Sequence, residues 1–257
     1  MLPDCYVGKH QLVQLFKSIL NPPYSFFNSV IVALDGPAGS GKTSTAKAVA
    51  RALDFTYLDT GAMYRAITLA SLNKKAEITK TLVSEVLDEV VLDIRYQEDE
   101  MHVFLNGLEV TPALRSEEVN DNVSLVASFG DVREKMVNQQ RMIANRVVER
   151  GGGVVIDGRD IGTVVFPGAD VKVFMSATPE VRARRRLEEL KEKQVEADYA
   201  EILENIRYRD KFDSSREIAP LRKADDALEL DTSVLSFQEQ VSRVVDIVKE
   251  RQVRSDV

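Results

Sequence analysis

Cysteine and histidine are both scarce in this chain of 257 residues. A single cysteine, Cys5, excludes an internal disulfide framework. The two histidines, His10 and His102, lie far apart in the sequence, and no spacing of histidine and cysteine resembles a zinc site. A supply this small also argues against a catalytic histidine. The chemistry must therefore be carried by other side chains.

Long apolar runs and an excess of positive charge are absent as well. Because no run of 18 or more apolar residues exists, no membrane span is predicted. The formal net charge of −7 argues against a nucleic-acid-binding surface over the whole molecule, so a site for anions must be a local basic cluster. We expect a soluble, cytoplasmic, monomeric protein whose partners include neither membrane nor nucleic acid.

The hydrophobic content of 44% is enough for one core with one or two inserted subdomains. Five apolar segments have the pattern of buried strands, at residues 30–35, 55–58, 154–157, 171–175 and 227–230. Their alternation with helical patterns predicts an α/β fold, with a parallel sheet covered by helices on both faces. Over residues 91–110 the apolar period changes to two around Asn106-Gly107, a strong hairpin signal. A small antiparallel sheet inside an insert is therefore expected.

The predicted division of the chain has four parts. They are an N-terminal extension at 1–29, a core at 30–59 and 143–257, an insert at 60–142, and a helical lid at 179–213 within the core segment. In the extension, apolar residues at helical spacing stop at Pro22-Pro23. A short helix on the core or a loosely ordered segment is the favoured interpretation, and a membrane-surface helix or a partner contact is the alternative.

The stretch from residue 30 to residue 53 has the pattern of a buried strand, a glycine-rich loop and a helix. The G-x-x-x-x-G-K-[ST] pattern of a phosphate-binding loop is filled by Gly36, Gly41, Lys42 and Thr43. Backbone N–H groups of such a loop surround an anion, which the helix N-terminus also attracts. Lys42 would reach the terminal phosphates, and the Thr43 hydroxyl is placed to bind Mg²⁺. An ordinary glycine-rich turn is the alternative. ATP is expected to lie against Gly36, Pro37, Ala38, Gly39, Ser40, Gly41, Lys42, Thr43 and Ser44.

Two further groups of charged residues suit phosphate chemistry. Asp157 ends an apolar strand and could hold Mg²⁺, although strand-end carboxylates are also common in turns. In the following turn, Arg159 could clamp a phosphate and Asp160 could accept hydrogen bonds from a base amine, or both could form a surface salt bridge.

Arginines gather in the predicted lid. Arg182 and Arg186 share a helix face and could reach the triphosphate when the lid closes, or could belong to a solvated surface beside Glu188 and Glu189. A second cluster nearby consists of Arg207, Arg209, Asp213 and Arg216.

Four blocks together resemble the bacterial cytidylate kinase family, and they occur in family order across about residues 30–250. The blocks are Val32-Ala-Leu-Asp-Gly-Pro-Ala-Gly-Ser-Gly-Lys-Thr43, Leu58-Asp-Thr-Gly-Ala-Met-Tyr-Arg65, Ile156-Asp-Gly-Arg-Asp-Ile-Gly-Thr-Val-Val-Phe-Pro167 and Arg209-Asp-x-x-Asp-x-x-Arg216. The resemblance implies a P-loop kinase core with a nucleoside-monophosphate-binding insert, and transfer of a phosphoryl group from Mg-ATP to CMP and dCMP. Residues 1–29 have no counterpart in a typical family member.

The resemblance also assigns roles to single residues. Thr60, where the family usually has serine, resembles a base-contacting hydroxyl, and Arg65 resembles an acceptor-positioning arginine. Ser124, Arg133 and Asp160 resemble the cytosine-reading residues. Arg159 resembles an α-phosphate ligand, Arg209 and Asp213 a sugar-contacting pair, and Arg216 an acceptor-site arginine. The predicted catalytic set is Lys42, Arg159, Arg182 and Arg186, and the predicted metal ligands are Thr43 and Asp157.

Cytosine chemistry agrees with these roles, because a carboxylate suits its exocyclic amine, whereas uracil would place an oxygen against Asp160. Two alternatives remain. The first is another P-loop small-molecule kinase acting on AMP, UMP or shikimate. The second is a nucleotide-dependent switch protein, although the Asn-Lys-x-Asp pattern that reads guanine is absent.

Overall fold

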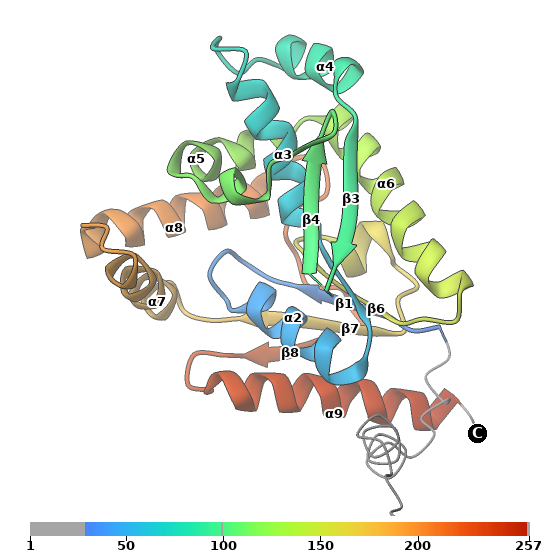
Figure 1. Cartoon of the computed structure of the whole chain (residues 1–257). Coiled ribbons are helices and arrows are strands. Elements are labelled where there is room, and N and C mark those ends of the chain that lie inside the picture. The colour runs from blue at the N-terminus through green and yellow to red at the C-terminus, as the bar shows by residue number, and fades with distance from the viewer. Residues whose placement is uncertain (1–28, 99, 256–257) are drawn as a thin grey trace, which may run out of the picture.

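The computed structural model describes residues 29–98 and 100–255, so the predicted helix within residues 1–28 lies outside the described residues. Five strands form one sheet: β1 (Ile31–Asp35), β2 (Thr56–Asp59), β6 (Val154–Gly158), β7 (Val171–Ser176) and β8 (Leu228–Asp231). Their order is β2-β6-β1-β7-β8, and all neighbouring pairs are parallel. The predicted parallel sheet is confirmed, and Figure 1 shows it across the middle of the molecule.

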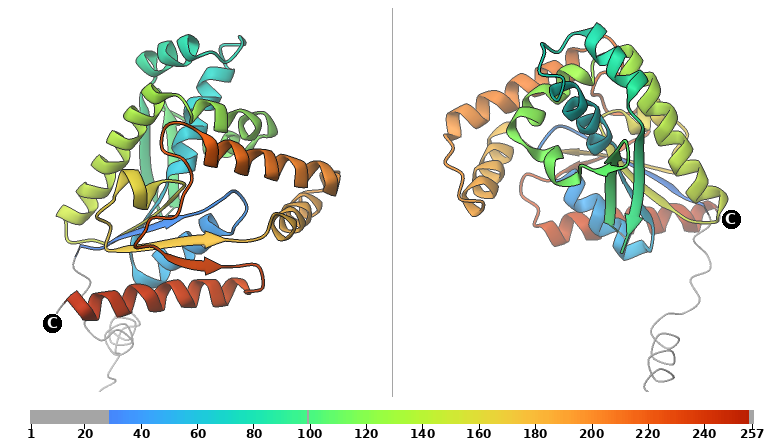
Figure 2. Two further views of the ribbon diagram at one scale, coloured as in Figure 1. Left: turned by 180° about the vertical axis from the view of Figure 1, so that it is seen from behind. Right: turned by 45° about the horizontal axis from the view of Figure 1, so that its top comes forward.

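Helices cover both faces of this sheet because successive strand residues point to opposite sides. Val32 and Leu34 of β1 pack in the core beneath α2 (Lys42–Leu53) and α9 (Phe237–Ser255). Ala33 packs on the opposite side, in the core that contains residues of α3 (Thr60–Leu72) and α6 (Gly130–Glu149). Figures 1 and 2 show α2 and α9 on one side of the sheet and α3 and α6 on the other. The predicted α/β class is therefore confirmed.

A small antiparallel sheet lies in the insert, as the period of two predicted. It consists of β3 (Leu92–Gln97), β4 (Glu100–Leu105) and β5 (Leu108–Glu109), and the turn between the last two has Asn106 at φ 50° and Gly107 at φ 83°. Its inner face packs into the same core as α3 through Leu92 and Val103.

Helical segments flank this sheet. They are α4 (Lys80–Glu89) before it, and η1 (Thr111–Arg115) and α5 (Glu117–Val126) after it. Helix α6 runs unbroken across the predicted boundary at residues 142 and 143. The boundaries of the insert therefore stay a prediction.

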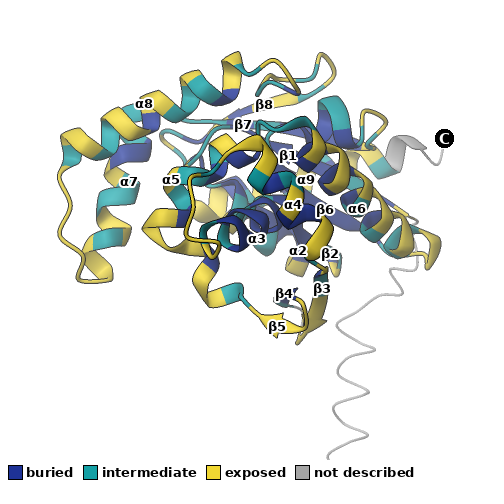
Figure 3. Cartoon of the chain, turned by 90° about the horizontal axis from the view of Figure 1, so that it is seen from above, coloured by how far each residue is buried: buried dark blue, intermediate teal, exposed yellow. Residues whose placement is uncertain are grey.

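The segment predicted as a lid is formed by α7 (Pro179–Glu192) and α8 (Tyr199–Ser215). The side chain of Thr178 caps α7 by accepting from the N–H of Val181, and Asp198 caps α8 in the same way. In α7 only Arg182 and Ala183 are buried, and in α8 only Ile206 and Asp213. Figure 3 shows these two helices as mostly exposed or half-buried elements beside the buried strands.

Candidate active site

The loop between β1 and α2 has the shape that binds phosphate. Gly39 and Gly41 adopt φ angles of 75° and 88°, which disfavour any side chain, and a Cβ on Gly36 would lie 2.0 Å from the carbonyl oxygen of Met175. The Lys42 side chain is buried beneath the loop, and its Nζ donates to the carbonyl oxygen of Pro37 at 2.7 Å. The loop thus leaves a helix N-terminus and a lysine facing the same space, as an anion requires.

Asp35, at the end of β1, ties this loop to the turn after β6. Its Oδ1 accepts from the N–H of Ile161 at 2.8 Å, and its Oδ2 accepts from the N–H of Gly162 at 2.7 Å. Burial raises the pKa of Asp35 to about 6. This role of Asp35 was not predicted. Like Asp157, Asp35 is a carboxylate at the end of an apolar strand, so the same sequence signal was present.

Asp157, the predicted Mg²⁺ ligand at the end of β6, makes two side-chain hydrogen bonds. The Thr43 hydroxyl donates to its Oδ2 at 2.8 Å, and the Tyr57 phenol donates to its Oδ1 at 2.8 Å. Burial, and after it the nearby charge of Asp59, raise the pKa of Asp157 to about 6. A buried carboxylate beside a threonine hydroxyl is an oxygen donor set that fits a hard cation.

These two residues would need further ligands to hold the ion. Among residues 29–98 and 100–255, no group of three or more histidine, cysteine, aspartate or glutamate side chains could hold a metal by itself. The nucleotide phosphates and water would therefore complete the coordination of Mg²⁺ at Thr43 and Asp157.

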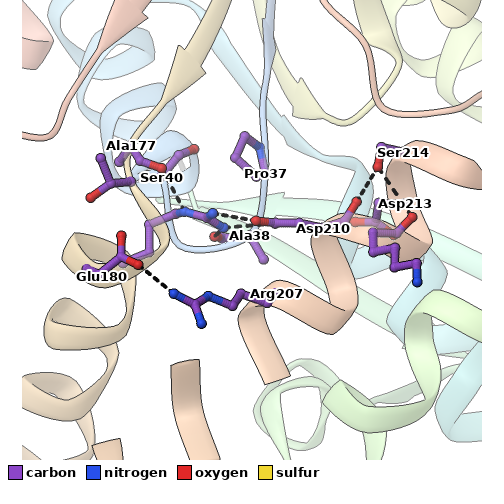
Figure 4. A network of polar contacts seen from close by, with 12 residues as sticks. Pro37, Ala38, Ser40, Ala177, Glu180, Arg207, Asp210, Asp213 and Ser214 are labelled. Carbon is purple, nitrogen blue, oxygen red and sulfur yellow. Dashed lines mark hydrogen bonds and ion pairs between the residues drawn. The ribbon is translucent and has the colours of Figure 1, made fainter. Parts of the chain in front are cut away.

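Two predicted catalytic arginines lie against the phosphate loop. Arg182 donates through Nη1 to the carbonyl oxygen of Ala38 at 3.0 Å, and both of its terminal nitrogens contact the carboxylate of Asp210, at 2.9 and 2.5 Å. Figure 4 shows Ala38, Asp210 and Ala177 around this network. Burial lowers the pKa of Lys42, and the positive charge of Arg159 lowers it further. Arg182 thus contacts the loop directly, and the charge of Arg159 acts on Lys42 beneath it.

The other lid arginines point elsewhere. Arg186 is exposed and pairs with Glu189 of its own helix at 3.1 Å, so its catalytic role stays a prediction. Arg185 donates to the carbonyl oxygen of Thr232 at 2.5 Å, which joins α7 to the end of β8.

Two of the predicted base-reading residues, Arg133 and Asp160, lie in a second, buried cluster. Arg133 of α6 donates to Asp160 Oδ2, and Arg216 lies 3.9 Å from Asp160 Oδ1. All three side chains are at most 5% exposed. The Thr60 hydroxyl, at the start of α3, donates to the carbonyl oxygen of Asp157 at 2.8 Å. Asp160 therefore lies between two cations that balance its charge.

Between the two clusters are further predicted residues. Arg159 Nε donates to Asp213 Oδ2 at 3.1 Å, which joins the turn after β6 to α8. The Nε of Arg209 is buried with no hydrogen-bond partner among the described residues, and burial lowers the pKa of this arginine to about 10. Such an unpaired donor is open to a ligand oxygen. Ser124 lies half-buried on α5.

Arg65 lines a cavity of about 90 Å³ between the large sheet and the insert, together with Tyr57, Asp59 and Arg115. Its Nε contacts Asn120 Oδ1 at 3.4 Å, and burial lowers its pKa. Asp59 caps α3 by accepting from the N–H of Ala62 at 2.8 Å. The sequence analysis did not assign Asp59, Asp210 or Tyr57.

The sequence signals for Asp59, Asp210 and Tyr57 differed in strength. Asp59 precedes a helix by the spacing of an N-cap, and Asp210 stands within the second arginine cluster, so both could have been found. Tyr57 lies in a strand, where a tyrosine is indistinguishable from core packing.

Comparison with known proteins shows which family the chain belongs to. The family described as cytidylate kinase matches residues 32–250. The cytidylate kinase of Salinibacter ruber is 49% identical over 220 residues, which cover 86% of this chain and 97% of the relative. The cytidylate kinase of Bacillus subtilis is 44% identical over 221 residues, which cover 86% and 96%.

Among solved structures, a shikimate kinase from Acinetobacter baumannii aligns at a TM-score of 0.43 and 12% identity, covering 89% of this chain and 98% of that one. A similarity this weak carries no conclusion. Within the described part of the chain, no helix combines the length and the hydropathy that crossing a bilayer requires. The family match and the two relatives each span most of the sequence, and by them this chain belongs to the cytidylate kinase family.

Proposed function

We propose that this chain transfers the γ-phosphoryl group of Mg-ATP to CMP and dCMP, giving CDP and dCDP. The observation that carries the proposal is the turn after β6. There, consecutive residues serve two clusters: Arg159 lies toward Lys42 and Asp213, and Asp160 lies between Arg133 and Arg216. One turn thus joins a phosphate-binding loop to a buried carboxylate that suits the cytosine amine.

The donor half of the site binds and neutralises the triphosphate. The loop N–H groups and the Lys42 ammonium face the phosphates, and Arg182 braces the loop from the lid side. When bound at Thr43 and Asp157, Mg²⁺ would supply further charge neutralisation. Positioning and neutralisation of charge are the main contributions to phosphoryl transfer.

The acceptor half needs no strong general base. A phosphate oxygen of CMP is already ionised at neutral pH. It forms a bond to the γ-phosphorus while the bond from that phosphorus to the bridging oxygen of ADP breaks. The proposed role of Arg159 is to hold the acceptor phosphate in line, and the charge of Arg209 nearby supports it. This arrangement fits a chain with two histidines.

In this proposal the base is recognised by matching hydrogen-bond donors on cytosine with acceptors on the protein. A carboxylate has about four lone-pair sites, so Asp160 can contact both arginines and still accept from the cytosine amine. Uracil would present an oxygen to the same carboxylate and leave a buried acceptor mispaired, at a cost of about 1–3 kcal/mol. The hydroxyls of Thr60 and Ser124 complete the proposed contacts to the base.

The proposal is tested by a coupled assay of ADP formation from ATP with CMP, dCMP, UMP or AMP as the acceptor. The expected result is turnover of CMP and dCMP at a higher kcat/KM than UMP or AMP. Faster turnover of AMP or UMP would favour the first alternative, another small-molecule kinase. ATP binding without turnover of any acceptor would favour a switch protein.

A further inference from the structure

Tyr57 lies behind the proposed magnesium site, in a position that packing alone does not explain. It belongs to β2, and in the parallel pairing of β2 with β6 it stands opposite Val155. Asp157 is two residues further along β6, so both side chains lie on the face of the sheet covered by α2. The tyrosine is 6% exposed, and its phenol donates to Asp157 Oδ1 at 2.8 Å.

The two oxygens of Asp157 are thereby divided between two donors. Tyr57 occupies Oδ1, and the Thr43 hydroxyl contacts Oδ2 at 2.8 Å. Because both contacts must be kept, the carboxylate cannot rotate freely, and Oδ2 stays beside the first turn of α2. Oδ2 is therefore the oxygen that shares space with Thr43, the other proposed ligand.

No neighbouring residue substitutes for this phenol. Asp59, the next residue of β2 on the same face, is an acceptor, and it is engaged by the N–H of Ala62 and by Arg115 at 3.6 Å. The Thr60 hydroxyl donates to the main chain of Asp157 and leaves its carboxylate untouched. Tyr57 is thus the donor that orders Oδ1.

We propose that Tyr57 is a positioning residue for the divalent cation: its phenol holds Asp157 so that Oδ2 and the Thr43 hydroxyl meet Mg²⁺ together. The proposal rests on the proposed function, because the cation is that of Mg-ATP. Hydrogen-bond partners behind a metal ligand typically change metal affinity by about 10–100-fold. A comparable loss is expected when the phenol is removed.

The test is Tyr57→Phe in the full chain, which keeps the ring and removes one hydroxyl. Calorimetry measures ATP binding with a chelator present, and then the apparent Mg²⁺ affinity at saturating ATP. We expect metal-free ATP binding to be unchanged and Mg²⁺ affinity to fall by about tenfold. The matched control is Tyr64→Phe, since Tyr64 is 7% exposed, its ring lies 5.5 Å from Arg133 of the other cluster, and no hydrogen bond joins its hydroxyl to Thr43 or Asp157.

Three results would overturn the proposal. They are an unchanged Mg²⁺ affinity in Tyr57→Phe, an equal loss in Tyr64→Phe, or an equal loss of metal-free ATP binding. In each of them the wild-type protein still binds Mg-ATP and turns over CMP, so the proposed function stands. If the wild-type protein shows no Mg²⁺-dependent binding of ATP, the proposed function and the role of Tyr57 fail together.

Discussion

Single residues decide which ligand each half of the site accepts. Asp160 is at most 4% exposed and lies between Arg133 and Arg216, so its charge is balanced before any base arrives. An ionised carboxylate only accepts hydrogen bonds, whichever way it is turned. The preference for an amine over a carbonyl oxygen is therefore built into the free protein.

Asp160→Ala should lower kcat/KM for CMP by at least about tenfold and leave ATP affinity nearly intact. The reason is that the variant loses the acceptor for the base amine while the phosphate loop is untouched. Steady-state kinetics with CMP, together with ATP titration, measure both effects. Asp160→Asn is the matched variant, because an amide keeps the size and adds a donor, so the ratio of CMP to UMP turnover should fall. Unchanged CMP kinetics in both variants would remove Asp160 from the base site.

The titration of Asp35 makes the free energy of unfolding depend on pH, and the direction of that dependence follows from its raised pKa. Burial raises its pKa from 3.8 to about 6, so the folded state binds this proton more tightly than the unfolded chain. Stability from this group is present below about pH 4 and is lost as the pH rises to about 6. Asp35→Asn lacks the titration, so the wild-type free energy of unfolding relative to the variant should fall by about 3 kcal/mol across that range. Urea unfolding of both proteins from pH 4 to pH 7 measures this difference. Parallel profiles would show that Asp35 does not titrate there.

At the scale of single residues, a role can be predicted from the sequence when that residue type in that motif has one common function. A lysine in a phosphate loop has one common role, and Lys42 lies where the motif places it. Asp35 and Tyr57 act through partners more than 90 residues away in the chain, Ile161, Gly162 and Asp157. Only the folded pairing of β1, β2 and β6 brings those partners close. No spacing within the sequence could reveal them.

At the scale of elements, two ion pairs join α7 to α8, and they differ in how deeply they are buried. Arg182 of α7 is 2% exposed and pairs with Asp210 of α8. The second contact, from Arg207 to Glu180, joins side chains that are 60% and 44% exposed. Figure 4 labels Glu180 and Arg207 of the exposed pair and Asp210 of the buried pair. The buried pair should dominate, because an exposed pair is screened by solvent.

Asp210→Ala should destabilise the protein by about 1–3 kcal/mol, because the buried Arg182 loses its carboxylate. Glu180→Ala is the matched control from the same helix pair, and it should cost less stability than Asp210→Ala, because solvent screens the exposed pair. Urea unfolding gives both values. Equal costs for the two variants would contradict this ranking of the α7–α8 contacts.

Most elements could be predicted from patterns that depend on nearby residues. The strands, the Asn106-Gly107 turn and the caps at Thr178 and Ser236 follow from apolar period and turn chemistry, and the structure contains all of them. The turn at Ile161–Val165 was not predicted as an element, and it forms a short π-helix. Its first N–H groups are held by the distant Asp35, so the local sequence carries no signal for it.

At the scale of the whole molecule, the first described strand of the parallel sheet begins at Ile31. The N–H of Val154 donates to the carbonyl oxygen of Val30 at 2.8 Å, and the N–H of Ile31 donates to Asp170 at 2.8 Å. These contacts begin after residue 29, and the family match begins at residue 32.

Deletion of residues 1–28 should therefore leave phosphoryl transfer within a few-fold of the full chain. The same coupled assay on the truncated protein measures this, with circular dichroism as the control for folding. Loss of folded protein would show that the extension belongs to the core.

The central claim is that one crevice holds two polyanionic ligands end to end. The most direct measurement is the affinity of a single molecule in which adenosine and cytidine are joined through five phosphates. The account predicts that it binds one per chain, displaces both ATP and CMP, and binds at least about 100-fold more tightly than either nucleotide alone. An affinity no better than that of ATP, or displacement of ATP without CMP, would contradict the account.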